Sequence, residues 1–352
     1  MLVRLHSVMG LVLGAVLLVI GLTGSLLVFR EAIERSLSPN LWQVPQQSAA
    51  LPLHDMLARL EQIFPEDRLF ALRMPRERGE ALVAWMNDEH GLRVYLDPYS
   101  GRVLDARDPK ETFTGFLFAL HTSLLAGEAG ESLNGVVGLG SLGLVLTGAL
   151  LWRPSTRAFR AAVTIRHHNR TAMLYGLHTV MGIAAVIPLG LLVLTGAALV
   201  FYSTFQLVVS TVTGDRLREP LPQSLSQPAS RPSIDLIIQA ADAALPGAIT
   251  TWILFPREPT GVVTVRRRFA EEWHPNGRSF VRLDQYSGKV LAVENALHAS
   301  VGRRIENLLY PLHIGRFEGV AWQVLYVLAG LTPGILFLTG WLMRRRKHNS
   351  RD

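Results

Sequence analysis

Four long apolar runs divide an otherwise polar chain. They lie near residues 8–29, 133–152, 179–202 and 319–343. Each run is long enough to cross a bilayer, because about 20 apolar residues in a helix span the hydrocarbon core. The first run is too long for the apolar part of a typical signal peptide and lacks a small-residue cleavage site, so we expect it to remain as an anchor. The pattern predicts an α-helical membrane protein with four transmembrane helices.

Two long polar segments separate these runs, and both show the same order of elements. In the first segment, residues 52–64 have the spacing of an amphipathic helix, and alternating apolar positions then predict four short strands. The strands are expected near residues 68–74, 80–86, 91–97 and 102–106. Residues 233–245 and the strands after them repeat this order. The pattern therefore predicts two α+β domains that arose by internal duplication.

A shared turn sequence supports the repeat. Residues 97–104 and 284–291 both read Asp-x-x-Ser-Gly-x-Val-Leu. Asp and Gly at these places suit a tight turn between two strands, because Gly adopts positive φ without strain. We interpret this motif as structural rather than catalytic. A stretch rich in Pro, Ser and Gln at residues 219–232 is the expected linker into the second copy.

Charged residues are distributed unevenly along the chain. The loop at residues 153–170 carries five arginines and no acidic residue, whereas all but Asp352 of the 28 acidic residues lie in segments 31–132 and 203–318. Basic loops stay on the cytoplasmic side, so we expect both termini inside and both polar segments outside. This topology accounts for the net charge of +7 and the pI of 10.1 without a nucleic-acid partner, and the lipid bilayer is the expected partner.

The expected organisation follows from hydropathy and charge together. Transmembrane helices are predicted at residues 1–30, 133–152, 178–202 and 319–343, outer α+β domains at 31–132 and 203–318, a basic cytoplasmic loop at 153–177, and a basic cytoplasmic tail at 344–352.

The absence of cysteine removes several kinds of site. The chain has no Cys, so it cannot hold a thiolate iron–sulfur cluster, a cysteine zinc site, a disulfide or a covalent c-type haem. A redox cofactor would depend on histidine, methionine or oxygen ligands.

Histidines recur at fixed offsets together with Thr-Gly pairs. His6 precedes Thr23-Gly24, and His178 precedes Thr195-Gly196, at an offset of 172 positions for both (178−6 and 195−23). His121 precedes Thr147-Gly148, and His313 precedes Thr339-Gly340, at an offset of 192 (313−121 and 339−147). The small Thr-Gly pairs would let a helix or a flat porphyrin approach closely.

The four histidines are candidate haem ligands. A histidine at membrane depth is costly unless it is paired or bound, and neutral imidazole is a standard axial ligand of haem iron. His6 and His178 begin runs that start on the inner side, whereas His121 and His313 precede runs that start on the outer side. The sequence thus predicts an inner haem b on the first pair and an outer haem b on the second.

Other interpretations of these residues stay open at this point. A histidine at a helix end is often an interfacial capping or hydrogen-bonding residue. Met9 and Met181 also recur at the offset of 172 and lie three residues after His6 and His178, on the same helix face. Methionine could replace one histidine as an axial ligand, although packing is its more common role.

These residues carry a resemblance to a known family. The Asp-x-x-Ser-Gly-x-Val-Leu turns resemble PepSY domains, and the Leu-His and Leu-Thr-Gly elements resemble the PepSY-associated transmembrane-helix family over nearly the whole chain. The compact four-helix form is similar to ferric-siderophore reductases of the FoxB type in bacterial inner membranes. The resemblance implies PepSY-like periplasmic domains, two haem b groups, and reduction of Fe(III)-siderophores outside for iron release. No flavin or nicotinamide site is evident, so the expected electron donor is a cytoplasmic protein or a quinol.

The sequence also suggests residues that contact the substrate and an alternative function. Substrate contact is expected from His298 and from the arginines near His313, namely Arg303, Arg304 and Arg316, with Arg266, Arg267 and Arg268 as a more distant group. Lipid phosphates or haem propionates are the alternative partners of the first three arginines. The alternative function is a haem-free PepSY membrane scaffold that binds peptides or regulates a peptidase.

Overall fold

The chain folds into two compact units, each built from segments that are distant in sequence. The structure, a computed structural model, describes residues 1–352 except 48, 66–68, 89–90, 153–163, 166–168, 226–231, 318 and 350–352. The helical unit comprises residues 1–30, 114–205 and 309–352, and the sheet unit comprises residues 31–113 and 206–308.

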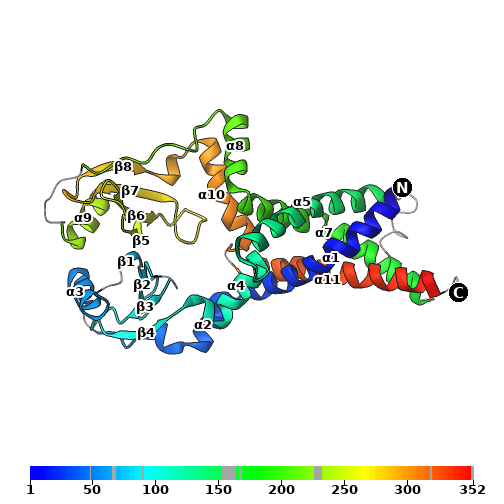
Figure 1. The fold of residues 1–352 in the computed structure, drawn as a ribbon, viewed down its shortest axis with the longest axis horizontal. Helices are drawn as coiled ribbons and strands as arrows, with labels where there is room; N and C mark the ends of the chain where they lie inside the picture. The colour runs from blue at the N-terminus through cyan, green and yellow to red at the C-terminus, as the bar shows by residue number, and fades with distance from the viewer. Residues whose placement is uncertain are drawn as a thin grey trace. The chain divides into compact units, whose positions relative to one another are not determined.

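Four long helices form the helical unit (Figure 1). They are α1 (Leu2–Leu27), α5 (Gly127–Leu151), α7 (Arg170–Val200) and α11 (Val320–Asn349). Each is long and apolar enough to cross a membrane. Both α1 and α7 pack mainly against α5 and α11, so α1 and α7 occupy diagonal positions in the bundle. The contact between α1 and α11 is close, because a side chain on Gly21 would collide with the carbonyl of Gly330.

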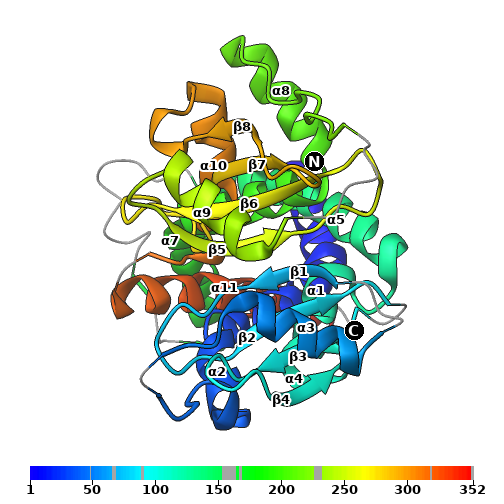
Figure 2. The ribbon, with the colours of Figure 1, turned by 90° about the vertical axis from the view of Figure 1, so that its left-hand side faces the viewer.

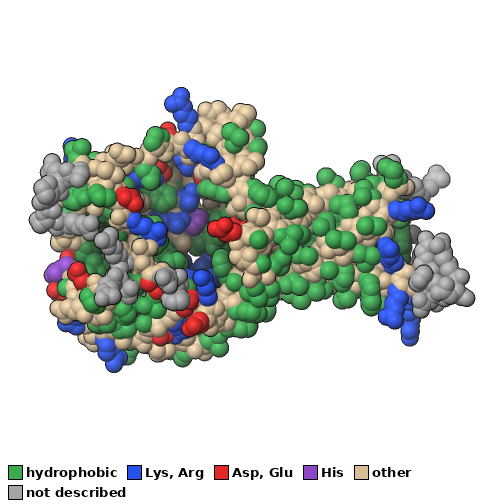
Figure 3. Space-filling model, in the orientation of Figure 1, with side chains coloured by type: hydrophobic (Ala, Val, Ile, Leu, Met, Phe, Trp, Pro, Cys, Tyr) green, Lys and Arg blue, Asp and Glu red, His purple; other side chains and the backbone are tan. Residues whose placement is uncertain are grey.

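The outer surface of the bundle suits a lipid environment. Large apolar side chains point outward along the helices, and Ile187 and Leu146 are 81% and 63% exposed. Figure 3 shows hydrophobic side chains covering the bundle, with Lys and Arg gathered at one end. Both chain termini lie at that same end (Figure 1). The bundle therefore has the surface of a multi-pass membrane protein.

Two of the long helices, α5 and α7, begin earlier than the apolar runs predict. Helix α5 starts at Gly127 rather than at residue 133, and α7 starts at Arg170 rather than at residue 178. The side chain of Asn169 caps α7 by accepting a hydrogen bond of 2.8 Å from the Ala172 amide. Hydropathy marks only the apolar part of a helix, whereas the capping residue sets its first turn. His178 thus lies two turns inside α7. Of the predicted basic loop, residues 153–163 and 166–168 lie outside the described residues.

The sheet unit is built around one antiparallel sheet of eight strands. Its strands are β1 (Leu69–Arg73), β2 (Leu82–Met86), β3 (Arg93–Leu96), β4 (Val103–Arg107), β5 (Ile249–Leu254), β6 (Val262–Arg268), β7 (Ser279–Asp284) and β8 (Val290–Glu294). Their order is β4-β3-β2-β1-β5-β6-β7-β8. Strands β1 and β5 join the two halves, with Leu72 opposite Ile253. The two α+β segments expected as separate domains therefore share one sheet.

Helices α3 (Leu53–Ile63) and α9 (Ile234–Ala244) cover one face of this sheet (Figure 2). Leu72, Ile253 and Val265 on the strands are fully buried, and Leu60 and Ala241 pack against the sheet from the helices. Successive strand residues point to opposite faces, so buried and part-exposed residues alternate when helices cover only one face of the sheet. Further helices are α2 (Arg30–Leu37), α4 (Phe113–Ser123), α8 (Tyr202–Thr213) and α10 (Val301–Ile314).

The repeated Asp-x-x-Ser-Gly motif forms the predicted turn in both halves. Gly101 and Gly288 have φ values of +69° and +71°, so the prediction of positive φ is confirmed. The Asp97 carboxylate accepts a hydrogen bond of 2.8 Å from the Tyr99 amide and one of 2.7 Å from the Ser100 hydroxyl. Burial alone would raise the pKa of Asp97, but these hydrogen bonds outweigh it and hold the pKa below its usual range.

Candidate functional site

His6 and His178 face one another from diagonal helices of the bundle. His6 lies in the first two turns of α1, and His178 lies in α7. Their ring centres are 6.3 Å apart and their planes are nearly perpendicular, at 89°. These are the two residues that helix direction assigned to the inner level.

His121 and His313 form a second pair. His121 lies near the end of α4 and His313 near the end of α10. Their ring centres are 6.2 Å apart, with 43° between the planes. Side chains of the following helices hold the backbone at these points, because Asn134 donates to the His121 carbonyl at 2.6 Å and Tyr326 donates to the Leu312 carbonyl at 2.6 Å. The structure thus brings together the same two pairs that the sequence predicted.

Each histidine rests against a Thr-Gly pair on another helix. The Nδ1 atom of His6 lies 3.0 Å from the Thr147 hydroxyl, and that of His178 lies 2.8 Å from the Thr339 hydroxyl. The corresponding distances are 3.3 Å from His121 to Thr23 and 3.1 Å from His313 to Thr195. One nitrogen of each ring is therefore engaged within the protein, and Nε2 is the nitrogen left for a ligand.

The glycine of each pair makes room for the histidine ring. A Cβ atom built on Gly24 would lie 2.8 Å from Cε1 of His121, and one on Gly196 would lie 3.0 Å from Cε1 of His313. The same distance is 3.2 Å from Gly148 to His6 and 3.6 Å from Gly340 to His178. The rings thus occupy the space that larger residues would fill. Sequence reasoning linked these glycines to helix or porphyrin packing and missed their contact with the histidines.

The contacts follow the two halves of the chain. His6 and His121 contact Thr-Gly pairs of the first half, and His178 and His313 contact those of the second. By contrast, each histidine pair joins one residue from each half. Each half of the chain therefore supplies one histidine to each pair, and the two pairs are built in the same way.

The donor set fits the axial ligation of haem iron. Within the described part of the chain, no group of three or more His, Cys, Asp or Glu side chains could hold a metal ion, so a four-ligand protein zinc site is not formed there. Two imidazoles suffice when a porphyrin supplies the remaining ligands. A metal–imidazole bond is about 2 Å long, and the ring centre lies roughly 1 Å behind the nitrogen, so one shared ion places ring centres roughly 6 Å apart. The observed 6.3 and 6.2 Å agree with this spacing.

Met9 has a packing contact that accounts for its position. A Cβ atom on Gly143 of α5 would lie 3.5 Å from the Met9 methyl group, which is ordinary van der Waals contact. This contact places the Met9 side chain against α5. The His6–His178 pair already provides two facing imidazoles, so we assign Met9 to packing.

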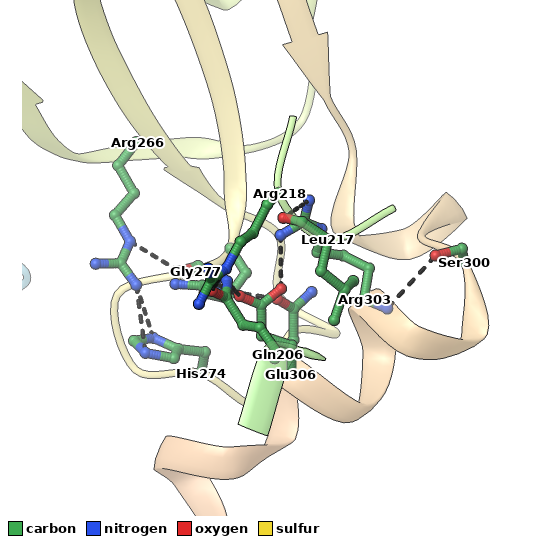
Figure 4. A network of polar contacts seen from close by, with 11 residues as sticks. Gln206, Leu217, Arg218, Arg266, His274, Gly277, Ser300, Arg303 and Glu306 are labelled. Atoms are coloured by element: carbon green, nitrogen blue, oxygen red, sulfur yellow. Dashed lines mark hydrogen bonds and ion pairs between the residues drawn. The ribbon is translucent and has the colours of Figure 1, made fainter. Parts of the chain in front are cut away.

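The residues expected to contact substrate lie in both units. His298, Arg303 and Arg304 belong to the sheet unit, and Arg316 belongs to the helical unit. Arg303 donates to the Glu306 carboxylate at 2.6 Å and to the Leu217 carbonyl at 3.1 Å, as part of the network in Figure 4.

The remaining residues of this group are more exposed. Arg304, His298 and Arg316 are all exposed, and Arg304 donates to the Ala299 carbonyl at 2.9 Å. Arg303 and Arg304 therefore have structural partners, and substrate contact by any of the four stays a prediction.

The three arginines of β6 divide between the two faces of the sheet. Arg267 is only 2% exposed, and its guanidinium binds Asp242, the Thr250 hydroxyl and carbonyls after the end of α9. It therefore stabilises the packing of α9 and is unsuited to bind an external ligand. Arg266 points from the other face toward His274 (Figure 4), at 3.2 Å from Nδ1. Sequence reasoning did not distinguish these roles, which depend on strand alternation.

His274 is a buried neutral histidine in a basic surrounding. Its side chain accepts a hydrogen bond of 3.1 Å from the Asn276 amide. Burial, followed by the charges of Arg266, Arg278, Arg76 and Arg268, lowers the pKa of His274 to about 2. This cluster of His274 and arginines could not be anticipated from the sequence, because its members come from separate loops and strands.

This low pKa predicts a loss of stability in mild acid. The unfolded chain binds a proton at His274 below pH 6.5 and the folded chain does not, so stability is full above pH 6.5 and falls as the pH drops toward 2. The slope approaches about 1.4 kcal/mol per pH unit. The melting temperature of the full-length protein in detergent is measured at pH 7.5 and at pH 5. The difference between the two values should be smaller for His274→Gln than for wild type. The exposed-site control His298→Gln should behave as wild type; equal pH dependence in all three proteins would refute the prediction.

A known protein family matches nearly the whole chain. No curated protein sequence matches it. The sequence pattern of the family described as the PepSY-associated TM region matches residues 3–347. The match includes all four apolar helices, both histidine pairs and the eight-stranded sheet. The chain therefore belongs to the family of proteins with a PepSY-associated transmembrane region.

Proposed function

We propose that the chain is a dihaem b protein that carries electrons across the bacterial inner membrane and reduces Fe(III)-siderophores on the periplasmic side. The observation that carries this proposal is the presence of two histidine pairs with ligand spacing in one apolar bundle. The proposed haem ligands are His6 and His178 at one level and His121 and His313 at the other.

The two levels are far enough apart to connect the two membrane surfaces. His6 and Thr23, which contacts His121, are separated by 17 positions on α1 (23−6). This separation corresponds to about 25 Å along a helix axis. The hydrocarbon core is about 30 Å thick. One pair therefore lies near each end of a membrane-spanning path.

The protein's own residues hold the ligands and exclude water. Thr hydroxyls engage Nδ1 of each imidazole and leave Nε2 for iron, while the surrounding helices present apolar side chains. Bound haem b supplies one-electron redox chemistry. In this proposal an electron enters at the level of His6 and His178 and leaves at the level of His121 and His313, where external Fe(III) becomes Fe(II). Siderophores hold Fe(II) far less tightly, so the iron is released.

The direction of transfer rests on topology. We infer that the end of the bundle with both termini is cytoplasmic, because Lys and Arg gather there (Figure 3). The sheet unit, which contains most acidic residues, is then periplasmic. The repeated order of helix and four strands, and the equivalent Thr-Gly contacts, support an internal duplication. The electron donor would be a cytoplasmic protein or a membrane quinol.

A haem-free scaffold explains less of the molecule. A scaffold that binds peptides or regulates a peptidase would need the sheet unit, which has its own core. It would not need four histidines that meet in pairs at ring distances of 6.3 and 6.2 Å inside a membrane bundle. The histidine pairs therefore favour electron transfer.

Anaerobic mixing tests the reductase proposal. Purified protein is reduced with dithionite, freed of excess reductant and mixed with ferrioxamine-type and other Fe(III) chelates while haem reoxidation is followed by absorbance. The Ga(III) complex of each chelator is the matched control, because it resembles the iron complex in shape and charge but does not accept an electron. We expect rapid reoxidation by at least one Fe(III) chelate and none by its Ga(III) counterpart.

A variant lacking the outer ligand locates the reaction. His313→Ala should retain the inner haem but lose most of the fast reoxidation, because electrons would no longer reach the outer level. Reoxidation by every Fe(III) chelate at the rate seen with Ga(III) complexes would refute the reductase assignment even in a protein with two haems.

A further inference from the structure

The threonine hydroxyls beside the four histidines act as hydrogen-bond acceptors. Each hydroxyl proton is already directed to a carbonyl of its own helix: Thr339 donates to Ile335 at 2.8 Å and Thr147 to Leu144 at 3.0 Å. Thr23 and Thr195 donate in the same way to the carbonyls of residues 19 and 191, at 2.8 and 2.7 Å. The hydroxyl oxygen is then left to accept a proton from the imidazole.

A backbone carbonyl one turn before the threonine provides a second acceptor for the imidazole. Nδ1 of His121 lies 2.9 Å from the carbonyl oxygen of Ile20, three residues before Thr23. His6, His178 and His313 also form hydrogen bonds with the backbone of the residue three positions before their threonine, namely Leu144, Leu336 and Leu192. Since a carbonyl can only accept, Nδ1 of His121 carries the proton. In the other three rings the contact of Nδ1 with a threonine hydroxyl that already donates to its own helix assigns the proton to the same nitrogen.

We propose that Thr23, Thr147, Thr195 and Thr339 are positioning residues that fix the proton on Nδ1 and lower the reduction potential of the haem that each one serves. This inference rests on the proposed function. An imidazole that donates a hydrogen bond from Nδ1 is a more basic ligand at Nε2, and a more basic ligand favours the oxidised metal. The threonine also fixes the rotation of the ring, because the hydroxyl and carbonyl acceptors lie on one helix.

Isosteric substitution separates the hydroxyl from the shape of the side chain. Thr147→Val keeps the branched side chain but removes the acceptor, whereas Thr147→Ser keeps the hydroxyl. Thr332→Val is a matched control on α11, because Thr332 is buried and donates to its own helix at 2.7 Å, to Leu328. Each substitution is made in wild-type protein and in His313→Ala, where the inner haem can be titrated alone.

Potentiometric titration of haem absorbance is the measurement. We expect Thr147→Val to shift the midpoint potential of the inner haem to a more positive value and to weaken haem retention by about 10-fold, the usual effect of removing a hydrogen-bond partner of a metal ligand. Thr147→Ser should restore both properties to near wild type, and Thr332→Val should change neither. The outer haem should be unaffected in all three variants.

The outcomes distinguish this inference from the proposed function. Wild-type protein without haem overturns both. If wild type holds two haems and the midpoint potential of the inner haem is equal in wild type and Thr147→Val, the threonine role alone is overturned. If Thr147→Val loses the inner haem altogether, recovery in Thr147→Ser supports the role, and failure to recover it contradicts the role.

Discussion

Alanine at His6 is expected to remove the same haem as alanine at His178. Each proposed haem depends on one imidazole from each half of the chain, so loss of either ring would remove one of the two side chains that would hold it. Haem content should fall from two per chain toward one, with loss of one low-spin absorption species. His121→Ala and His313→Ala should both deplete the other species.

Double variants make this pairing decisive. Combining His6→Ala with His178→Ala should add little to either single change, whereas combining His6→Ala with His121→Ala should deplete both haems. His54→Ala is a suitable control, because His54 is exposed in the sheet unit and contacts Asp235. If His6→Ala and His121→Ala depleted the same species, the proposed cross-half pairing would be wrong.

A methyl group on Gly24 is expected to displace His121 and eliminate the outer low-spin haem. The added Cβ would lie 2.8 Å from Cε1 of the ring, closer than real Cβ contacts allow. At Gly340 the same methyl would lie 3.6 Å from His178, an ordinary contact. Gly24→Ala should therefore lose most of one haem, and Gly340→Ala should keep both.

The matched pair controls for effects on the helices themselves. Alanine favours a helix over glycine by about 1 kcal/mol, so neither substitution weakens its helix through backbone propensity. Haem content and the low-spin absorbance of the two variants are the measurements. Full retention of the outer haem in Gly24→Ala, or greater loss in Gly340→Ala, would contradict the assigned contact.

The helices and histidine pairs could be anticipated because they depend on local patterns. Apolar runs define the membrane segments, and the direction of each run places His6 with His178 and His121 with His313. The start of α7 could not be derived in this way, because the cap at Asn169 lies outside the apolar run. The strands near residues 69–73 and 82–86 also follow from alternation of apolar and polar positions.

Contacts over long sequence distances were beyond such patterns. The Thr147 hydroxyl lies 141 positions from His6, and Thr339 lies 161 positions from His178. The repeat shows that Thr-Gly and His belong together, but it does not say which pair contacts which ring. The pairing of β1 with β5 was also not predicted, because the periodicity of a strand does not identify its neighbour at a sheet edge.

The most direct measurement of the central claim is the haem content of the full-length protein, purified from haem-replete cells and assayed as the pyridine haemochrome. The histidine pairs predict two b-type haems per chain, both low-spin in the visible spectrum of the untreated protein. A protein that is folded and contains no haem would contradict the claim.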